Sequence, residues 1–309
     1  MAKISKINNF KTRSKIKKIL ITGSEGFIGS AIVKLFIKKK NYVVFGIGKK
    51  KRVIKSYKYF SLNLLNKKKT KKFLQKYKFD IVIHAAWITD TKTMRHSKLN
   101  CQWYKSSINI VDAIKSQNPK IKFICIGSSD EYFRKKGENN ILYEDSSKIY
   151  NTNQYAKYKI LLLKYLKKIK IDYIWFRVFW LFGEKENSKR FFPSLIKAII
   201  NDRTFTINRP KIFLDYSYIG DAAKMIEKII FLKKNNKEKI FNICSGKTIN
   251  LYKIASKIQK IIGKKELLLT SKNNDGTSIL GSNIKLKKYK CYFRSDLEKN
   301  IRKYVKLHF

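Results

Sequence analysis

Acidic residues, proline and cysteine are scarce in this sequence, and each shortage limits what the chain can be. The 309 residues include 21 Asp and Glu against 71 Lys and Arg, a formal net charge of +50. Only 3 prolines and 13 glycines are present, which excludes a collagen-like chain. The 4 cysteines form no CxxC pair and have no histidine at a zinc-binding spacing, so the sequence predicts reduced thiols and no metal site.

Long hydrophobic runs are missing as well. The first apolar run, residues 19–21, ends at Thr22-Gly23, which is too short for a signal peptide. The most apolar later stretch, residues 173–182, is interrupted by Arg177 and falls short of the ~20 residues of a membrane-spanning helix. We therefore expect no membrane association and a cytoplasmic protein.

The positive charge has three interpretations. With 44% hydrophobic and 14% aromatic residues, the chain is not a disordered polycation. Its lysines are spread along the whole sequence, which favours a solvated coat over a nucleic-acid surface. Attraction of a polyanionic small substrate is the third interpretation.

Short apolar runs alternate with segments of helical periodicity after a basic tail, residues 1–15. The runs predict buried strands at 19–21, 42–45, 81–83, 123–126 and 173–176, and the periodic segments predict helices at 28–38, 70–76, 99–115 and 154–168. Such alternation indicates right-handed βαβ crossovers and a doubly wound parallel α/β sheet of the Rossmann type. We therefore predict a dinucleotide-binding domain over residues 16–182.

The pattern changes beyond residue 182, where the elements become shorter and less regular. Helices are predicted at 192–200, 218–231 and 250–262, and strands at 205–207 and 240–243. No Pro/Gly/Ser linker separates the two parts. We therefore predict a smaller substrate-binding domain, residues 183–309, partly interwoven with the first.

A glycine-rich loop follows the first predicted strand. It reads Thr22-Gly23-Ser24-Glu25-Gly26-Phe27-Ile28-Gly29, a GxxGxxG motif between a strand and a helix. Glycines there let the backbone turn sharply and approach a pyrophosphate, whose charge the N-terminal amides of the helix hold. The motif predicts a dinucleotide site over a purely structural turn, with cofactor contacts at Gly23, Gly26, Phe27, Ile28 and Gly29.

The end of the second predicted strand bears on the choice between NAD and NADP. NAD-binding domains usually place an acid there for the ribose 2′-hydroxyl. This sequence has no Asp or Glu between Glu25 and Asp80. The segment after Gly48 is basic instead, and Lys49, Lys50 and Arg52 suit a 2′-phosphate. The pattern favours NADP, with NAD as the alternative.

Acid–base chemistry is indicated by three residues. Ser128 follows the strand predicted at 123–126, and Tyr155 and Lys159 lie four apart on one face of a predicted helix. A phenol has an ordinary pKa of ~10 and is a poor acid–base group at neutral pH, unless a neighbouring ammonium favours phenolate. Lys159 is that neighbour, whereas His84 fits a packed structural histidine better than a catalyst.

Together these motifs resemble the extended short-chain dehydrogenase/reductases, in particular the nucleotide-sugar epimerase/dehydratase/reductase branch, from about Lys17 onward. The shared segments are the glycine loop, 84–86, Ser128, the Tyr155/Lys159 pair, 177–183, 214–216 with Asp221, and 242–246. The resemblance implies a Rossmann fold and a Ser128–Tyr155–Lys159 triad. In it, Tyr155 exchanges a proton with the sugar C4 oxygen, Ser128 hydrogen-bonds that oxygen, and Lys159 holds the nicotinamide ribose and lowers the pKa of Tyr155.

The resemblance also implies further contacts. Those with the cofactor are Asn63 and Leu64 beside the adenine, Ala85 and Ala86 at a strand edge, and Asn100 near the nicotinamide ribose. Those with the substrate are Trp87, Ser129, Trp180, Arg190 and Arg209. Relatives often dimerise through the helices equivalent to 99–115 and 154–168, which implies a homodimer.

Departures from the family pattern narrow the activity. Dehydratases carry an Asp/Glu pair directly after the triad hydroxyl, whereas Ser129 and Asp130 stand here. Trp180 replaces an Asn of many epimerases, and Leu214 replaces an Arg that often binds the nucleotide diphosphate. Arg190, Arg209 or Lys211 could supply that charge instead. We predict an NADP-linked enzyme that reduces the C4 keto group of a nucleotide-linked 6-deoxy sugar. The alternatives are a C4 epimerase and a non-catalytic dinucleotide sensor or RNA-binding scaffold.

Overall fold

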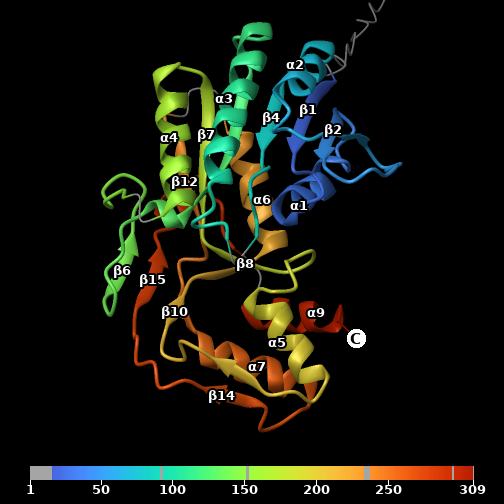
Figure 1. Ribbon diagram of the computed structural model, residues 1–309. Helices are drawn as coiled ribbons and strands as arrows, with labels where there is room; N and C mark the ends of the chain where they lie inside the picture. The colour runs from blue at the N-terminus through green and yellow to red at the C-terminus, as the bar shows by residue number, and fades with distance from the viewer. Residues whose placement is uncertain (1–15, 91–92, 151–152, 233–236, 294–295, 309) are drawn as a thin grey trace, which may run out of the picture.

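A seven-stranded parallel sheet organises the computed structural model (Figure 1). The structure describes residues 16–90, 93–150, 153–232, 237–293 and 296–308, so the predicted basic tail lies outside the described residues. The strands run in the order β12-β7-β5-β4-β1-β2-β3. Their bounds are β1 (Lys17–Thr22), β2 (Tyr42–Gly48), β3 (Lys58–Ser61), β4 (Ile81–His84), β5 (Lys122–Ser128), β7 (Asp172–Val178) and β12 (Ile240–Ile243).

Five of these strands coincide with the apolar runs of the first part of the chain. Sequence periodicity missed β3, because this four-residue strand pairs only with β2 at the sheet edge and none of its residues is fully buried. The strand predicted at 240–243 is present as β12 and pairs with β7 in the large sheet. The division into domains at residue 182 stays a prediction.

Helices cover both faces of the sheet, as expected for a doubly wound fold. On one face α3 (Leu99–Gln117) lies between α2 (Lys67–Lys76) and α4 (Gln154–Lys168), while α1 (Phe27–Phe36) packs on α6 (Ile219–Ile230) across the other face. Asn153 begins α4 by accepting a hydrogen bond from the amide of Ala156 at 2.9 Å, which is the usual role of an N-cap asparagine. The predicted α/β Rossmann class is confirmed.

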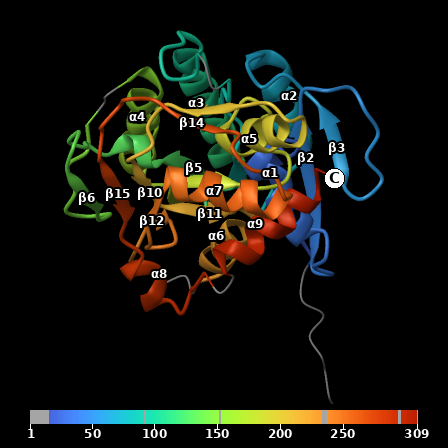
Figure 2. The same cartoon turned by 90° about the horizontal axis from the view of Figure 1, so that it is seen from below.

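The remaining elements build a smaller part at one end of the sheet (Figures 1 and 2). It contains a second sheet, two short strand pairs and four helices among the described residues. The second sheet has the order β13 (Ile249–Asn250), β10 (Phe213–Leu214), β15 (Ser278–Gly281) and β6 (Asn139–Leu142). The pairs are β8 (Trp180–Phe182) with β11 (Tyr216–Tyr218) and β9 (Phe205–Ile207) with β14 (Leu268–Thr270). The helices are α5 (Phe191–Ile200), α7 (Leu251–Ile262), α8 (Ile284–Lys288) and α9 (Leu297–Lys306).

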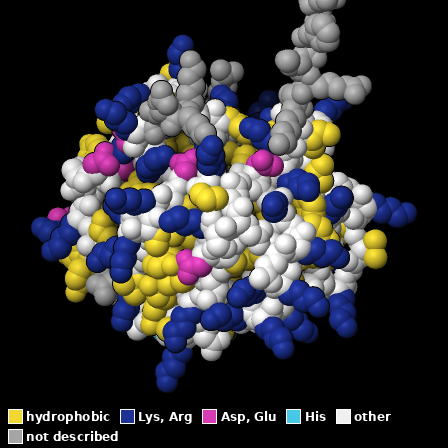
Figure 3. Space-filling view, turned by 90° about the horizontal axis from the view of Figure 1, so that it is seen from above, with side chains coloured by type: hydrophobic (Ala, Val, Ile, Leu, Met, Phe, Trp, Pro, Cys, Tyr) yellow, Lys and Arg dark blue, Asp and Glu magenta, His cyan; other side chains and the backbone are white. Residues whose placement is uncertain are grey.

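The surface shows where the positive charge lies. On the face drawn in Figure 3, Lys and Arg side chains are scattered among other residues rather than gathered into one patch. This distribution agrees with a solvated coat of lysines. Within the described ranges, no helix is long and apolar enough to span a membrane.

Candidate active site

The candidate site lies at the carboxyl ends of the central strands. β1 ends at Thr22, beside His84 of β4, and β5 ends at Ser128, beside Val178 of β7. Because parallel strands end at the same edge of a sheet, the loops that follow them border one cleft. A pocket of about 140 Å³ opens there, and the glycine loop, the end of β5, the start of α4 and the segment after β7 line it.

The glycine loop makes the close approaches that a dinucleotide site needs. Gly23 has a φ of +66°, and a Cβ at this position would lie 3.0 Å from the backbone of Ala86. A Cβ on Gly29 would overlap the carbonyl oxygen of Gly23. Gly26 begins α1 without a side-chain cap, so no cap side chain competes for the first amides of the helix. Since such amides bind phosphate, the residues present fit the pyrophosphate of a dinucleotide.

The other predicted cofactor residues lie around this loop. Ala85 and Ala86 follow β4, and the amide of Ala86 donates to Thr22 Oγ1 at 3.2 Å. Asn63 is exposed, while Leu64 is buried. Phe27 and Ile28 line the pocket of 140 Å³.

Asn100 is fully buried, and its side chain bonds within the protein. Its Oδ1 accepts a hydrogen bond from Trp87 Nε1 at 2.9 Å, and its Nδ2 donates to the carbonyl oxygens of Met94 at 2.6 Å and Ser97 at 2.9 Å. The side chain therefore holds the loop between β4 and α3. Its predicted contact with the nicotinamide ribose stays a prediction.

The end of β2 holds an acid that sequence reasoning missed. Glu25 of the glycine loop reaches this strand end and pairs with Arg52 and with the hydroxyl of Tyr59. Lys49 and Lys50 are exposed, and Lys49 Nζ lies 5.5 Å from the ring centre of Trp103. Of the three bases predicted to meet a 2′-phosphate, Arg52 is thus already engaged by a carboxylate.

The structure brings Ser128, Tyr155 and Lys159 together at the pocket. The hydroxyls of Ser128 and Tyr155 share a hydrogen bond, and both residues line the pocket. The pKa of Tyr155 is raised above its ordinary value, because burial, together with the negative charges of Asp130 and Glu131, outweighs the hydrogen bond from Ser128. Lys159 is not among the groups that set this pKa, so its expected effect on the phenol stays a prediction.

Lys159 is buried beneath the pocket rather than directed at the phenol. Its Nζ donates to the carbonyl oxygen of Ile126 at 2.7 Å and lies 3.8 Å from the ring centre of Trp87, but 5.7 Å from that of Tyr155. Burial lowers the pKa of Lys159 to about 8. Trp87, predicted to touch substrate, thus packs against the triad ammonium.

His84 is a structural residue. Its ring nitrogens pair with the hydroxyls of Thr22 at 2.9 Å and Ser107 at 2.8 Å, and the side chain is wholly buried. Burial, with a smaller effect from Lys159, lowers the pKa of His84 to about 3, so the imidazole is neutral. It links β1, β4 and α3 beneath the cleft.

The two acids that follow Ser128 have different environments. Glu131 is fully buried, where its carboxylate accepts hydrogen bonds from the amide of Ser128 at 2.8 Å and from Arg177 Nε at 2.9 Å. Asp130 borders the pocket and pairs with Arg95 at 3.0 Å. Glu131 therefore supports the end of β5, and Asp130 is the acid beside the cleft.

Three predicted substrate residues, Ser129, Trp180 and Arg190, line the pocket next to the triad. Sequence reasoning did not single out Arg134, which donates to Ser129 Oγ at 3.0 Å and lies 5.1 Å from the ring centre of Trp180. Arginine is common in a chain this basic, so only the fold distinguishes it.

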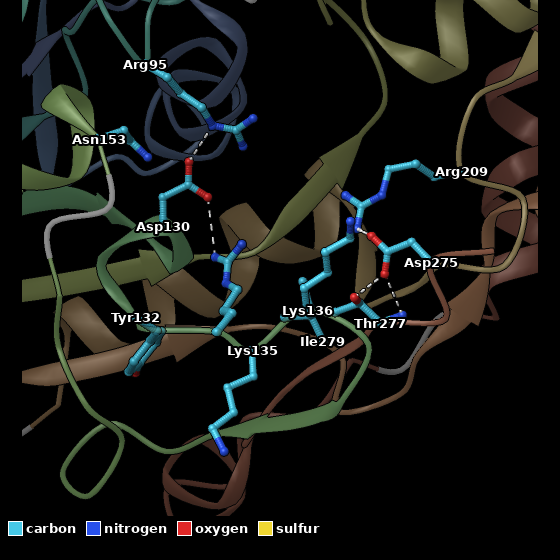
Figure 4. A pocket seen from close by; sticks show the side chains of 11 residues that line it. Arg95, Asp130, Tyr132, Lys135, Lys136, Asn153, Arg209, Asp275, Thr277 and Ile279 are labelled. Carbon is cyan, nitrogen blue, oxygen red and sulfur yellow. Dashed lines mark hydrogen bonds and ion pairs between the residues drawn. The ribbon is translucent and has the colours of Figure 1, made fainter. Parts of the chain in front are cut away.

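A second pocket of about 430 Å³ adjoins the first and shares Arg95 and Asp130 with it. Figure 4 shows Arg95 and Asp130 on one side and Arg209, paired with Asp275, on the other. The predicted substrate residue Arg209 therefore lies across the cleft from the triad side. Within the part of the chain that the structure describes, no cluster of His, Cys, Asp and Glu could hold a metal ion.

Comparison with solved structures shows the same fold. The structure of UDP-glucuronic acid 4-epimerase from Bacillus cereus superposes with a TM-score of 0.80 over 94% of this chain and 100% of that one, at 23% identity. This similarity agrees with the strand order and the cleft described above.

Two curated relatives match most of the chain. The chain is 28% identical over 273 residues to dTDP-D-glucose 4,6-dehydratase of Dictyostelium discoideum, and the match spans 80% of this chain and 62% of the relative. It is 23% identical over 243 residues to GDP-6-deoxy-D-talose 4-dehydrogenase of Aggregatibacter actinomycetemcomitans, over 77% of each chain.

The family assignment follows from a longer match. The sequence pattern of the NAD dependent epimerase/dehydratase family covers residues 19–244, from β1 to the end of β12. It includes the glycine loop and the triad and confirms the resemblance found in the sequence. Because the match spans well over half of the chain, the protein belongs to the NAD-dependent epimerase/dehydratase family.

Proposed function

We propose that this protein uses a nicotinamide dinucleotide, NAD or NADP, to reduce the C4 keto group of a nucleotide-linked 6-deoxy sugar. The observation that carries the proposal is the phenol of Tyr155 beside Ser128 in a pocket that the glycine loop also lines. A phenol keeps its proton at neutral pH, so Tyr155 can donate it in the reductive direction, and the phenolate that forms needs a nearby cation such as Lys159 to stabilise it.

The residues would divide the chemistry as follows. The reduced cofactor, when bound, supplies a hydride to the sugar C4. Tyr155 donates its proton to the C4 oxygen, so the carbonyl becomes an alcohol and the phenol becomes phenolate. Ser128 donates a hydrogen bond to the same oxygen and stabilises its developing negative charge. The buried Lys159 ammonium stabilises the phenolate until solvent returns the proton.

Substrate binding is proposed for the larger pocket. A nucleotide diphosphate carries negative charge, and Arg209, Arg95 and Arg134 line this pocket from two sides. Leu214, at the position where many relatives carry Arg, is buried. Arg209 is thus the candidate to supply that charge.

The acids argue for reduction rather than dehydration. A dehydratase needs an acid and a base beside the sugar in addition to the triad. Glu131 does not lie beside the cleft, because its carboxylate accepts hydrogen bonds from Arg177 and Trp175 in the core. Asp130 is the acid next to Ser128 that borders the pocket.

The test is turnover of a 4-keto-6-deoxy sugar nucleotide, prepared in the dTDP- and GDP-linked forms, with NADH or NADPH. We expect stoichiometric loss of nicotinamide absorbance and formation of the 4-hydroxy sugar. Y155F should lose ~10²–10⁴-fold in kcat, because it lacks the proton donor. The control is Y158F, which removes a hydroxyl from the same helix at a position outside the pocket.

Other outcomes would contradict the proposal. Interconversion of C4 epimers without net loss of reduced cofactor would establish the epimerase instead. Dinucleotide binding without turnover, and with Y155F indistinguishable from wild type, would favour a non-catalytic sensor.

A further inference from the structure

Glu186 is a buried acid that the proposed chemistry does not use. It lies in the segment between β8 and α5, and its side chain is only 2% exposed. Its Oε1 pairs with Arg190 Nε at 3.2 Å, while Oε2 is buried and meets no hydrogen-bond partner within the described part of the chain. The buried negative charge is therefore compensated by the Arg190 guanidinium.

Arg190 connects this acid to the active site. Its side chain is 37% exposed and lines the pocket of about 140 Å³ together with Tyr155 and Trp180. Burial and two nearby carboxylates raise the pKa of Tyr155, and Arg190 is the positive group that opposes them. Glu186 pairs with Nε, whereas an anion in the pocket can be bound by the N–H groups of the two terminal nitrogens.

The backbone that carries the two residues is held by its own hydrogen bonds. The amide of Glu186 donates to the carbonyl oxygen of Gly183 at 3.1 Å, and that of Arg190 donates to the carbonyl oxygen of Asn187 at 2.9 Å. The carbonyl oxygen of Arg190 accepts a hydrogen bond from the amide of Ser194, in the first turn of α5, at 3.0 Å. The long arginine side chain is therefore the part of this segment that can move.

Two further ionisable groups face Glu186, and both stay neutral near pH 7. They are the phenols of Tyr216 on β11 and Tyr304 on α9, whose pKa values are raised by burial and by the charge of Glu186. Burial raises the pKa of Glu186 itself to about 7, and the positive charge of Arg190 offsets this rise only in part. Glu186 is therefore the group of this cluster whose charge changes near neutral pH.

We infer that Glu186 is a positioning residue whose charged carboxylate holds the Arg190 guanidinium at the pocket, where Arg190 binds the substrate phosphate next to the sugar. The inference rests on the nucleotide-sugar substrate of the proposed function. When Glu186 takes up a proton the ion pair is lost, and ordering the arginine side chain for substrate costs conformational entropy. Substrate affinity should then fall as the pH falls, although the guanidinium keeps its charge.

The experiment measures KM and kcat for the dTDP- or GDP-linked 4-keto-6-deoxy sugar between about pH 6 and about pH 8.5, with saturating NADH or NADPH. If charged Glu186 makes binding about tenfold tighter, the KM of wild type should rise about fivefold from the upper to the lower pH. E186Q keeps an oxygen that can accept from Arg190 Nε but cannot titrate. We expect its KM to stay constant near the acid value of wild type, with kcat within about threefold of wild type.

E184Q is the matched control. It removes an acid from the same segment and changes the net charge equally, but the Glu184 carboxylate accepts the hydroxyl of Tyr218 at 2.6 Å. Its KM should vary with pH as in wild type.

R190Q tests whether Glu186 acts through the arginine. We expect R190Q to raise KM about tenfold, since it removes the charged ligand of the phosphate. Adding E186Q to R190Q should change KM no further, because no guanidinium is left to position.

Several results would overturn the inference while leaving the enzyme intact. A wild-type KM that is constant with pH, or that falls as the pH falls, would show that charged Glu186 does not hold Arg190 for the substrate. An E186Q variant with the wild-type pH dependence, a defect in kcat alone, or a defect that persists in the R190Q background would do the same. Absence of turnover by folded wild type at every pH would instead defeat the proposed function itself.

Discussion

A fall in pH should destabilise this protein, because His84 is buried in its neutral form. The imidazole is wholly buried between Thr22 and Ser107, with a pKa of about 3 in the folded protein against an ordinary value of 6.5. Between these values the unfolded chain binds a proton that the folded chain does not, so stability is lost as the pH falls through 6.5 toward 3. From about pH 7 to about pH 5 the loss from this one group is about 2 kcal/mol.

The assay compares urea unfolding of wild type and H84Q across this range. Glutamine keeps a polar group at the site but cannot titrate, so contributions from other acids and from the net charge cancel in the difference. We expect wild type to lose about 2 kcal/mol more than H84Q between about pH 7 and about pH 5. Imidazole NMR of the folded wild type provides a second measurement, in which His84 should stay neutral at about pH 5. Equal losses in the two proteins, or a His84 signal that titrates near its ordinary pKa, would refute the neutral buried imidazole.

Three further predictions follow from buried contacts at the site. G29A places a methyl group on the carbonyl oxygen of Gly23, so we expect a loss of about 1–3 kcal/mol in unfolding free energy and weaker NAD⁺ binding by titration. E131Q leaves the Arg177 guanidinium buried without its counter-charge, and urea unfolding should show a loss of about 3–5 kcal/mol. Wild type should gain stability from Lys159 as the pH rises from about 8 toward 10.5, because the unfolded chain still binds the proton there, and K159M should lack this gain.

Each of these variants has a matched control. G276A adds a methyl group where nothing lies within 4 Å, E138Q removes an acid that is 57% exposed, and K157M removes an exposed lysine from the helix that carries Lys159. All three should behave like wild type. The first prediction is contradicted if G29A keeps the stability and the NAD⁺ affinity of wild type. The second is contradicted if E131Q unfolds at the same urea concentration as E138Q. The third is contradicted if K159M gains as much stability at high pH as K157M.

Features that depend on neighbouring residues along the chain were predictable from the sequence. Helical periodicity located α4 at its observed bounds, and the four-residue spacing of Tyr155 and Lys159 put both on one side of it. The glycine loop was recognisable because its function resides in backbone turns and in residues without side chains. These signals are local, so no knowledge of distant segments was needed to find them.

Burial changed the electrostatics that the sequence suggested. Four-residue spacing predicted that Lys159 would lower the pKa of Tyr155, and this effect stays a prediction, because the fold turns the ammonium toward Ile126 and Trp87. It also buries the phenol near Asp130, and the pKa of Tyr155 rises. Spacing along a helix states which side chains can meet, whereas desolvation depends on everything packed around them.

The amino-acid order alone determined the alternation of strand and helix, the glycine loop and the placing of Tyr155 and Lys159 on one helix, since each depends on residues close together in the chain. Only the tertiary structure decided that Glu25 covers the end of β2, that Glu131 faces Arg177 in the core, and that Arg209 lies across the cleft from the triad side. The physical reason is that these three residues lie in loops and short turns, whose neighbours are set by packing of the whole chain, and no local pattern records them.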